Sequence, residues 1–584
     1  MSVGTTTDGT SGLGSNGQEY SVPRATEELF NTGLLKNPLV SRNLPKEAEE
    51  CSKSIRFEGN ESPSIPINWR FAESISSLKG LEATMINILL KRKYNVDAKE
   101  VVINTDHAQL FVMSAFLWVL DPDGEKVPFG SPQKNALKEK YFPDYDLHGA
   151  GKTPYRTAAT NIYRCKDGRY FHLHGSMNAH PTQDSLGLPH DNPTTTYEES
   201  IQPYIDKLSQ IDSATMQPLA SDQFKQAGTI CWTTDEYKTS AHGRANSHIS
   251  LWDIHSVPNP TQPPCWWPSI AETGPSRPLA GLKVIDLTRV IAAPAVTRGL
   301  AELGASVLRI TAPHVTDMTS LHPDLCWGKW NAHLDLRDEG QRETMRGLIL
   351  EADVVVSGYR PGVMDKYGFS QEEILELCKG RERGVVVVRE NCYGWNGEWS
   401  YRSGWQQISD ANCGVSMEFG RAMGNDEPVT PVFPNSDYCT GVAGVIGILD
   451  AILRRGSDGG SYKVDLSLNY YSQWLVNSVG VYPDAVWQDV WNRNGRLVFR
   501  HYHHMGYTIP RFMKMLTDNA KDVVLKDEFF ENRPSRLLGK PFRTVKPVIQ
   551  YRQGPVELRY NVSTRGNGID KPQWPKDLMT ELIA

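Results

Sequence analysis

The chain has 584 residues, of which 39% are hydrophobic and 22% are charged. At about 100–200 residues a domain, this length predicts two to four domains and excludes a peptide or a small disulfide-rich scaffold. The 62 basic and 68 acidic side chains leave a net charge of −6, which predicts no binding to nucleic acid or to an anionic membrane surface. We find no run of about 18 apolar residues, so we expect no membrane-spanning segment.

The cysteines and the ends of the chain indicate an intracellular protein. The nine cysteines are scattered without a Cys-x-x-Cys motif, a pattern typical of reduced thiols rather than of disulfides or a zinc site. Residues 1–23 are rich in Gly, Ser and Thr, and we expect them to form a disordered tail that is neither a signal nor a transit sequence. The predicted location is cytoplasmic.

A proline-rich stretch divides the chain. Residues 258–278 read PNPTQPPCWWPSIAETGPSRP, a composition typical of a linker. We therefore expect an N-terminal half over residues 24–257 and a second half over residues 279–490. An extension over residues 491–584 is expected to pack back on the core.

In chain order, the second half alternates short Val-rich strands with helices. Strands are expected at Gly281–Thr288, Ala305–Thr311, Ala352–Ser357 and Gly384–Arg389, and helices at Ala293–Leu303, Arg342–Glu351 and Ser370–Cys378. This alternation predicts an α/β fold with a doubly wound parallel sheet. The turn after the first strand lacks a Gly-x-Gly-x-x-Gly motif, so no NAD site is expected.

A weak internal repeat links the two halves. At a spacing of 363 residues, Gly80–Leu90 aligns with Ala443–Leu453, and Glu100–Thr105 aligns with Lys463–Leu468. Each copy reads as a helix with a basic end, a turn and a strand. The pattern marks either a duplication or the general likeness of helix-turn-strand units.

Four segments of the second half resemble the class III CoA-transferases of the CaiB/BaiF type, the relatives of formyl-CoA transferase, carnitine CoA-transferase and methylacyl-CoA racemase. The segments are Pro278–Pro294, Leu303–Ile310, Ala352–Gly368 and Asn435–Gly460, and they follow the family's order. The resemblance implies a Rossmann-like sheet with a smaller α+β domain. It also implies transfer of CoA from an acyl-CoA donor to a small carboxylic acid acceptor.

The first half is similar to the family's small domain, in an unexpected order. The similar segments are Asn161–Leu173, Ile201–Leu208, Ala227–Cys231 and Glu236–His242, and Lys540–Pro547 resembles a late β segment of the family. The resemblance implies a fused, rearranged tandem whose halves form an internal pseudo-dimer. Such a chain acts either as a monomer or as a homodimer.

The resemblance implies that Asp437 is the nucleophile. A carboxylate can attack a thioester to form a mixed anhydride and then an aspartyl-CoA thioester, from which the acceptor carboxylate takes the CoA. The alternative is that Asp437 only caps a helix that begins near Cys439, because Asp is a favoured N-cap residue. The internal repeat places Ser74 opposite Asp437 in the first copy.

Coenzyme A carries phosphates, so its site needs cations and helix N-termini at the carboxyl edge of the sheet. The resemblance suggests eight CoA-contacting residues, which are Arg289, Ile291, Ala292, Trp327, Lys329, Tyr359, Arg360 and Lys366. For Arg360 and Lys366 the alternative is an ordinary solvated charge. No metal is expected, because the segment His501–His504 lacks a carboxylate or cysteine partner at a suitable spacing.

Departures from the family pattern keep two other hypotheses open. Gly358 stands where the family has Asn, Thr311 and Ala312 replace a Glu-Pro or Glu-Arg pair, and Trp405 replaces a histidine of the racemases. Because an indole cannot transfer a proton at the α-carbon, an acyl-CoA racemase or isomerase is disfavoured. A non-catalytic CoA-binding homologue is the remaining alternative.

Overall fold

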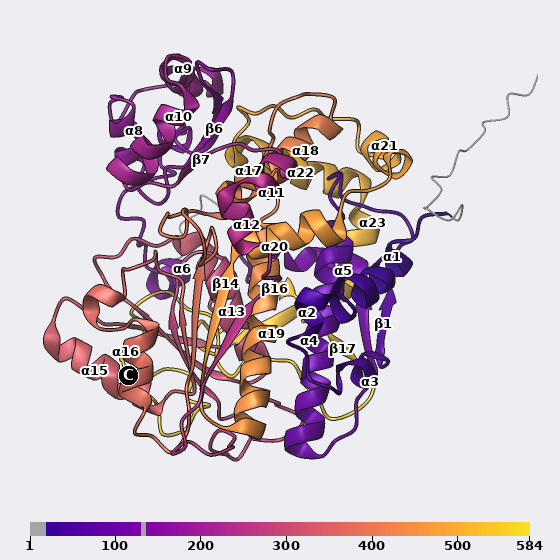
Figure 1. Cartoon of the computed structure of the whole chain (residues 1–584), viewed down its shortest axis with the longest axis vertical. Helices are drawn as coiled ribbons and strands as arrows, with labels where there is room; N and C mark the ends of the chain where they lie inside the picture. Colours follow the sequence, from indigo (N-terminus) through magenta and orange to yellow (C-terminus); the bar gives the residue numbers. More distant parts are fainter. Residues whose placement is uncertain (1–18, 130–135) are drawn as a thin grey trace, which may run out of the picture.

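The structure is a computed structural model that describes residues 19–129 and 136–584. At its centre lies a seven-stranded sheet of order β11-β10-β9-β12-β13-β14-β8 (Figure 1). Neighbouring strands are parallel, except that β8 is antiparallel to β14. The strands are β8 (Asp253–Val257), β9 (Lys283–Leu287), β10 (Ser306–Thr311), β11 (Lys329–His333), β12 (Val354–Ser357), β13 (Val386–Asn391) and β14 (Ser461–Ser467).

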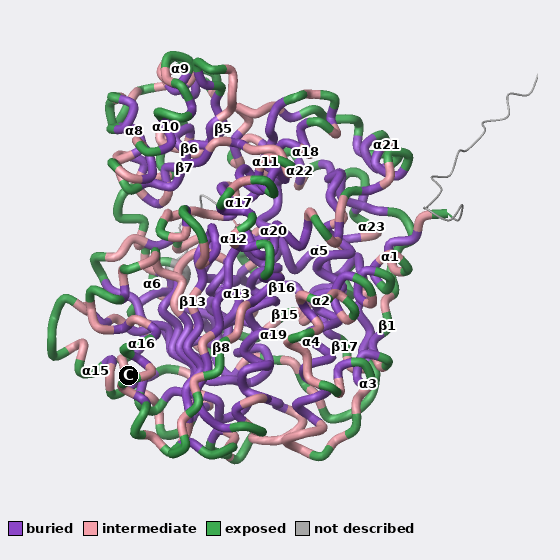
Figure 2. Tube along the Cα trace, viewed as in Figure 1, coloured by how far each residue is buried: buried purple, intermediate pink, exposed green. Residues whose placement is uncertain are grey.

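Helices cover both faces of this sheet, and its strands are buried between them (Figure 2). Successive residues of a strand point to opposite faces, so Val284 of β9 packs with α13 and α19, whereas Ile285 packs with α15 and α16. The helices are α13 (Ala292–Glu302), α15 (Glu339–Glu351), α16 (Gln371–Cys378) and α19 (Asn435–Asp458). The α/β doubly wound fold predicted from the alternating pattern is confirmed.

The helix α19 runs through the core, and it begins earlier than its sequence pattern indicates. It starts at Asn435 rather than near Cys439, and it is 24 residues long. Among the described residues it is the one helix that is long and apolar enough to cross a membrane, and 94% of its most apolar window is buried inside the protein. Such burial is typical of the central helix of a packed domain.

A second helix of the same length, α4 (Phe71–Tyr94), packs against α19. The elements that follow also correspond, because β2 (Val101–Asn104) leads into α5 (Thr105–Phe111) as β14 leads into α20 (Leu468–Trp474). Within both helices the third residue is acidic, Glu73 in α4 and Asp437 in α19. Counted from the helix starts, the counterpart of Asp437 is therefore Glu73, one position before the expected Ser74.

The sheets around these helices have the same local topology. In a three-stranded sheet, β2 pairs in parallel with β1 (Ile55–Glu58) and antiparallel with β17 (Gln550–Tyr551). In the large sheet, β14 pairs in parallel with β13 and antiparallel with β8. The repeat seen in the sequence therefore extends to strand direction and pairing.

A smaller α+β domain projects from the sheet, at the upper left of Figure 1. It contains the antiparallel strands β5 (Asn161–Arg164), β6 (Tyr170–Leu173) and β7 (Gly228–Ile230). The helices α8 (His180–Ser185), α9 (Tyr197–Leu208) and α10 (Ser213–Pro218) pack on them around a separate hydrophobic core. The predicted smaller domain is confirmed.

Residues 491–584 contact both parts of the chain. In a four-stranded sheet, β16 (Lys540–Val545) pairs with β15 (Phe530–Ser535) and with β3 (Val119–Leu120). Further along, β17 completes the sheet of β1 and β2. Near the end of the chain, the Thr580 carbonyl oxygen accepts a hydrogen bond of 2.8 Å from Trp330 Nε1.

The proline-rich stretch 258–278 is packed rather than free. Gln262 Nε2 donates to the Cys378 carbonyl oxygen at 3.0 Å, and Trp267 Nε1 donates to the Ala280 carbonyl oxygen at 2.8 Å. The strand before this stretch, β8, belongs to the sheet of the second half. The expected boundary at residue 258 therefore does not separate two independent sheets. The chain already enters the seven-stranded sheet with β8, before residue 258.

Most of the expected N-terminal tail, residues 1–18, lies outside the described residues. The rest of it is ordered, since Ser21 is buried and caps α1 (Val22–Leu29). The Tyr20 hydroxyl donates to Glu73 Oε1 at 2.5 Å. The expectation of disorder up to residue 23 is wrong for residues 20–23, because buried partners on α4 order them.

Candidate active site

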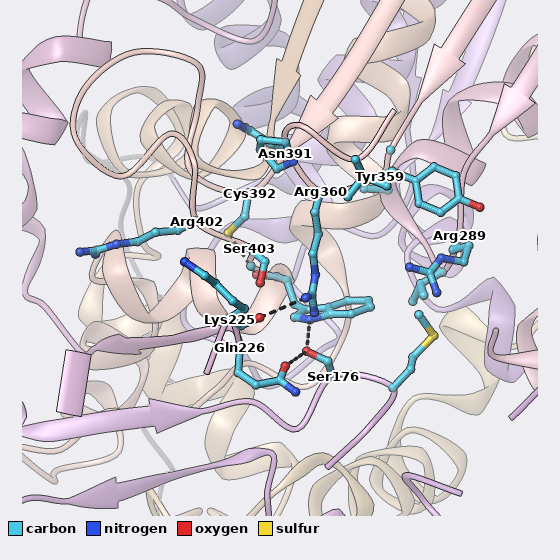
Figure 3. A pocket seen from close by; sticks show the side chains of 18 of the residues that line it. Ser176, Lys225, Gln226, Arg289, Tyr359, Arg360, Asn391, Cys392, Arg402 and Ser403 are labelled. Carbon is cyan, nitrogen blue, oxygen red and sulfur yellow. Dashed lines mark hydrogen bonds between the residues drawn. The ribbon is translucent and has the colours of Figure 1, made fainter. Parts of the chain in front are cut away.

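A pocket of about 480 Å³ opens at the carboxyl edge of the large sheet. Its walls include the turns after β9 and β12 and the end of β13 (Figure 3). The strand order reverses between β9 and β12, because the chain first moves outward through β10 to β11 and then returns to the other side of β9. Doubly wound sheets bind their ligands at such a switch point.

The opposite wall of the pocket comes from the smaller domain. Its lining residues there are Ser176, Met177, Asn178, Pro181, Phe224, Lys225 and Gln226. Figure 3 shows the Arg360 side chain, which comes from the turn after β12, reaching the backbone of Lys225, and Ser176 hydrogen-bonded to Gln226 beside it. The site is therefore built from two segments that are distant in the sequence.

Asp437 lines this pocket from the first turn of α19. The N-cap of α19 is Pro434, so the hypothesis that Asp437 only caps a later helix is wrong. Asp437 is 9% exposed, and among the described residues its carboxyl has no hydrogen-bond or ion-pair partner. Burial raises the pKa of Asp437 to about 8, which outweighs the stabilisation of negative charge at a helix N-terminus.

Two helix N-termini without a side-chain cap meet at the pocket. The N-cap residues are Ile291 for α13 and Pro434 for α19, and neither provides a side-chain hydrogen bond. Gly441 allows the close approach of the two helices, since a Cβ there would lie 2.6 Å from the Ala295 Cβ. Free N–H groups and the positive ends of the helix dipoles favour binding of an anion.

Glu390, at the end of β13, is a second carboxyl in the pocket. It is also 9% exposed, and no hydrogen-bond or ion-pair partner for it exists among the described residues. Burial, and then the charge of Asp437, raise the pKa of Glu390 to about 8. The negative charge of Asp437 therefore favours the protonated form of Glu390.

Three arginines, Arg289, Arg360 and Arg402, line the pocket, and the first two are fixed by hydrogen bonds to carbonyl oxygens. Arg289 Nη1 donates to the Thr316 carbonyl oxygen at 2.6 Å, and its guanidinium lies 5.1 Å from the centre of the Tyr359 ring. Arg360 Nη1 donates to the Lys225 carbonyl oxygen at 3.0 Å, which joins the sheet edge to the smaller domain. These arginines place positive charge where the phosphates of a cofactor-sized anion could bind.

Three residues on the pocket walls have a left-handed backbone. Their φ angles are +70° for Val290, +52° for Ser176 and +54° for Lys225. Such a conformation is least expected for a β-branched residue such as Val290. Strained backbone clusters at functional sites, where the surrounding structure imposes it.

Trp405, which the sequence resemblance aligns with a histidine of the racemases, lines the pocket. Its Nε1 donates to Ser176 Oγ at 3.0 Å, and its indole stacks on the His174 ring, with 5.2 Å between the ring centres. His174 is not among the residues that line the pocket. Among the described residues, the one histidine that does so is His148, which is exposed, so no buried imidazole lines the pocket.

The structure brings together six of the nine predicted site residues, namely Asp437, Arg289, Ile291, Ala292, Tyr359 and Arg360. Lys366 is exposed and lies outside the pocket. Trp327 is buried against Phe542. Lys329 is buried too, and its Nζ bonds Asp286 Oδ2 and the Pro294 carbonyl oxygen, each at 2.9 Å. Neither of these two side chains reaches the pocket.

Sequence reasoning missed Glu390, Asn391, Cys392, Arg402, Ser403 and the lining residues of the smaller domain. A usable signal existed for Glu390, since it directly follows the predicted buried strand Gly384–Arg389, which contains the run Val385–Val388. Cys392 is a poor candidate nucleophile, because burial raises the pKa of its thiol well above the usual range.

The chain is similar to known proteins along nearly its whole length. A protein of Hypoxylon pulicicidum named an acetyl-coenzyme A transferase is 49% identical over 568 residues, which is 97% of this chain and 95% of that protein. An acyl-CoA transferase of Gibberella moniliformis is 29% identical and covers 93% of this chain and 94% of its own. An acetyl-CoA:oxalate CoA-transferase of Acetobacter aceti is 31% identical over 34% of this chain and 54% of its own. The family model described as CoA-transferase family III matches residues 279–503.

Proposed function

The chain belongs to CoA-transferase family III and is a CoA-transferase; from this premise we propose that it moves CoA through an aspartyl-CoA thioester on Asp437. The observation that carries the proposal is the buried, unpartnered carboxyl of Asp437 in a pocket at the switch point of the sheet. An anion without hydrogen bonds or counterions is a better nucleophile than one that water solvates.

The proposed sequence has two symmetrical halves. Asp437 attacks the donor thioester, and the CoA thiolate that leaves returns to the aspartyl carbonyl to give the enzyme thioester and the free donor acid. The acceptor carboxylate then attacks this thioester, and CoA returns to the acceptor acyl group by the same steps. Water must be excluded throughout, which the small exposure of Asp437 favours.

We assign the CoA moiety to the wall formed by Arg289, Ile291, Ala292, Tyr359 and Arg360. The two arginines would pair with phosphates, and the uncapped N-terminus of α13 would donate N–H groups to an anionic oxygen. The acceptor would be a small carboxylic acid, because the acid must reach the carboxyl carbon of Asp437 directly.

The first experiment is intact-protein mass spectrometry after incubation with acetyl-CoA and other acyl-CoAs, with and without hydroxylamine. We expect a covalent adduct that hydroxylamine removes, and we expect the adduct to be absent from Asp437→Asn. A matched control is Asp450→Asn, a buried acid of the same helix that pairs with Arg454 outside the pocket. An adduct that persists in Asp437→Asn would refute the role of this residue.

We also propose that the chain is an internal pseudo-dimer. The proposal is supported by the equal lengths of α4 and α19, by their mutual packing, and by the matching strand directions around β2 and β14. The first copy differs at the corresponding acid, because Glu73 accepts hydrogen bonds from Tyr20 and Tyr482 and is completely buried. Catalysis would then belong to the second copy.

A further inference from the structure

We propose that Glu390 is a catalytic residue that gives a proton to the sulfur of CoA as the donor thioester breaks and takes it back as that sulfur attacks the aspartyl anhydride. This inference rests on the proposed function of Asp437. It extends that function by naming the group that manages the charge of the departing thiolate.

The first support is position. Glu390 and Asp437 line the same pocket from the end of β13 and the first turn of α19. A Cβ at Gly358 would lie 3.7 Å from Glu390 Oε2 and only 2.7 Å from the Ala293 Cβ. The glycine therefore leaves no side chain between Glu390 and the N-terminus of α13, where the thioester is expected to bind.

The second support is the absence of a structural partner. Apart from Asp437, the other buried carboxyls among the described residues have ion-pair or hydrogen-bond partners, as Asp324 has Arg298 at 2.5 Å and Asp353 has Arg383 at 2.7 Å. Glu390 has no such partner among the described residues. An unpaired buried acid destabilises a fold when it ionises, so its presence in the pocket indicates a chemical use.

The third support is charge balance. When the Asp437 carboxylate attacks the thioester carbon, the C–S bond breaks and its electron pair goes to sulfur. The Glu390 O–H bond then breaks and an S–H bond forms, which leaves CoA as a thiol and Glu390 as a carboxylate. When the sulfur attacks the anhydride, Glu390 recovers the proton and the donor acid leaves as a carboxylate. The site holds one negative charge at every stage.

The proton affinities suit this exchange. The pKa of Glu390, about 8, is close to the value of about 8.5 typical of a thiol, and proton transfer is most effective between groups of similar pKa. The other ionisable groups around Glu390 on the walls and the adjoining helix are Asp437, Asp410, Cys392, Tyr359, Arg289, Arg360 and Arg402. Of these, Asp437 is the one whose charge acts most on Glu390.

The test compares two acyl donors in single-turnover acylation of Asp437. Acetyl-CoA releases an alkyl thiolate that needs a proton, whereas 4-nitrophenyl thioacetate releases a much more acidic aryl thiolate that does not. We expect Glu390→Gln to slow acylation by acetyl-CoA by about 10²–10⁴-fold and to leave acylation by the aryl thioester within about threefold. Glu372→Gln, an exposed acid outside the pocket, should change neither rate.

The outcomes separate this inference from the proposed function. Equal loss of both reactions in Glu390→Gln would make Glu390 a structural residue, and no loss of either would make it a bystander; both results overturn the inference. Acylation that survives in Asp437→Asn would instead overturn the proposed function, whatever Glu390 does.

A measurement on the unchanged protein keeps the test independent of whether variants fold. Acylation by acetyl-CoA needs an ionised Asp437 and a protonated Glu390, so its rate should rise and then fall with pH. Acylation by the aryl thioester needs only the ionised Asp437, so its rate should rise to a plateau. Identical pH profiles for the two donors would contradict the proposed role.

Discussion

Asp437 and Glu390 each place a carboxyl in the protein interior with no partner among the residues that the structure describes, and an ionised group in that setting costs free energy. The same pocket holds a valine with a left-handed backbone, which is also unfavourable. At the scale of single residues, the site thus concentrates features that lower stability. By contrast, charged residues outside the pocket, such as Lys329 and Asp286, form a buried ion pair.

Replacing Asp437 by Asn should stabilise the protein in a pH-dependent way. The pKa of Asp437 is raised from its ordinary value of 3.8 to about 8, so the folded state holds this proton more tightly than the unfolded state does. The contribution of this bound proton to the free energy of unfolding is complete below pH 3.8, the ordinary pKa, and is lost as pH rises towards 8. The variant lacks this loss, so its melting temperature should exceed that of the wild type by about 2–5 °C at pH 8 and by less at pH 5. Thermal melts of both proteins from pH 5 to pH 9 check this; a pH-independent difference would contradict it.

The sequence could predict those residues of the candidate site that lie close to a predicted strand along the chain. Arg289, Ile291, Ala292, Tyr359 and Arg360 directly follow predicted strands, and parallel strands bring their carboxyl ends to one edge. Lys329 lies outside the pocket because its side chain points from β11 into the core, where it bonds Asp286. The sequence does not show this side-chain direction. The smaller-domain wall could not be predicted, since nothing local brings Lys225 next to Arg360.

At the scale of elements, the turn between β9 and α13 connects the sheet to the pocket. Arg289, Val290 and Ile291 lie between the end of the strand and the first residue of the helix. The φ of +70° at Val290 lets this short turn place Arg289 beside Tyr359 while α13 still starts at Ala292. The sequence indicates the strand and the helix by their periodicity, but not the strained turn that joins them.

Replacing Val290 by Gly should weaken the binding of CoA while it costs little stability. Glycine adopts positive φ without the strain of about 1–2 kcal/mol that a side chain suffers there, so Val290→Gly should lose less stability than Val363→Gly. Val363 is a matched, half-buried pocket valine without a positive φ. The freer turn should bind CoA several-fold more weakly. Thermal melts and calorimetric titration with CoA measure the two effects, and a Val290→Gly variant that is the less stable of the two would argue against strain.

At the scale of the whole molecule, the pocket needs distant parts of one chain. Residues 148–226 provide one wall and residues 289–468 provide the others. The fold class and the repeat could be predicted from periodicity, because each depends on segments of about thirty residues. The position of β8 at the edge of the seven-stranded sheet could not be predicted. The sequence of a strand does not by itself specify which strand lies beside it.

A chain that supplies every wall of its own pocket should work as a monomer. We expect sedimentation to give the mass of one chain, 65.4 kDa, and specific activity to stay constant as the enzyme is diluted from micromolar to nanomolar concentration. The control is the same dilution series with a carrier protein, which corrects for adsorption. Activity that falls on dilution together with a change in mass would contradict the expectation that one chain is sufficient for activity.

The pairing of β17 with β2, and of β16 with β3, has a consequence during synthesis. When the ribosome has made the first third of the chain, β2 and β3 lack partners that follow more than 400 residues later. Unpaired strand edges attract other chains, and contacts so distant in sequence form slowly. The nascent protein therefore presents exposed β edges until its last fifty residues emerge, and chaperones that bind extended segments would act in that interval.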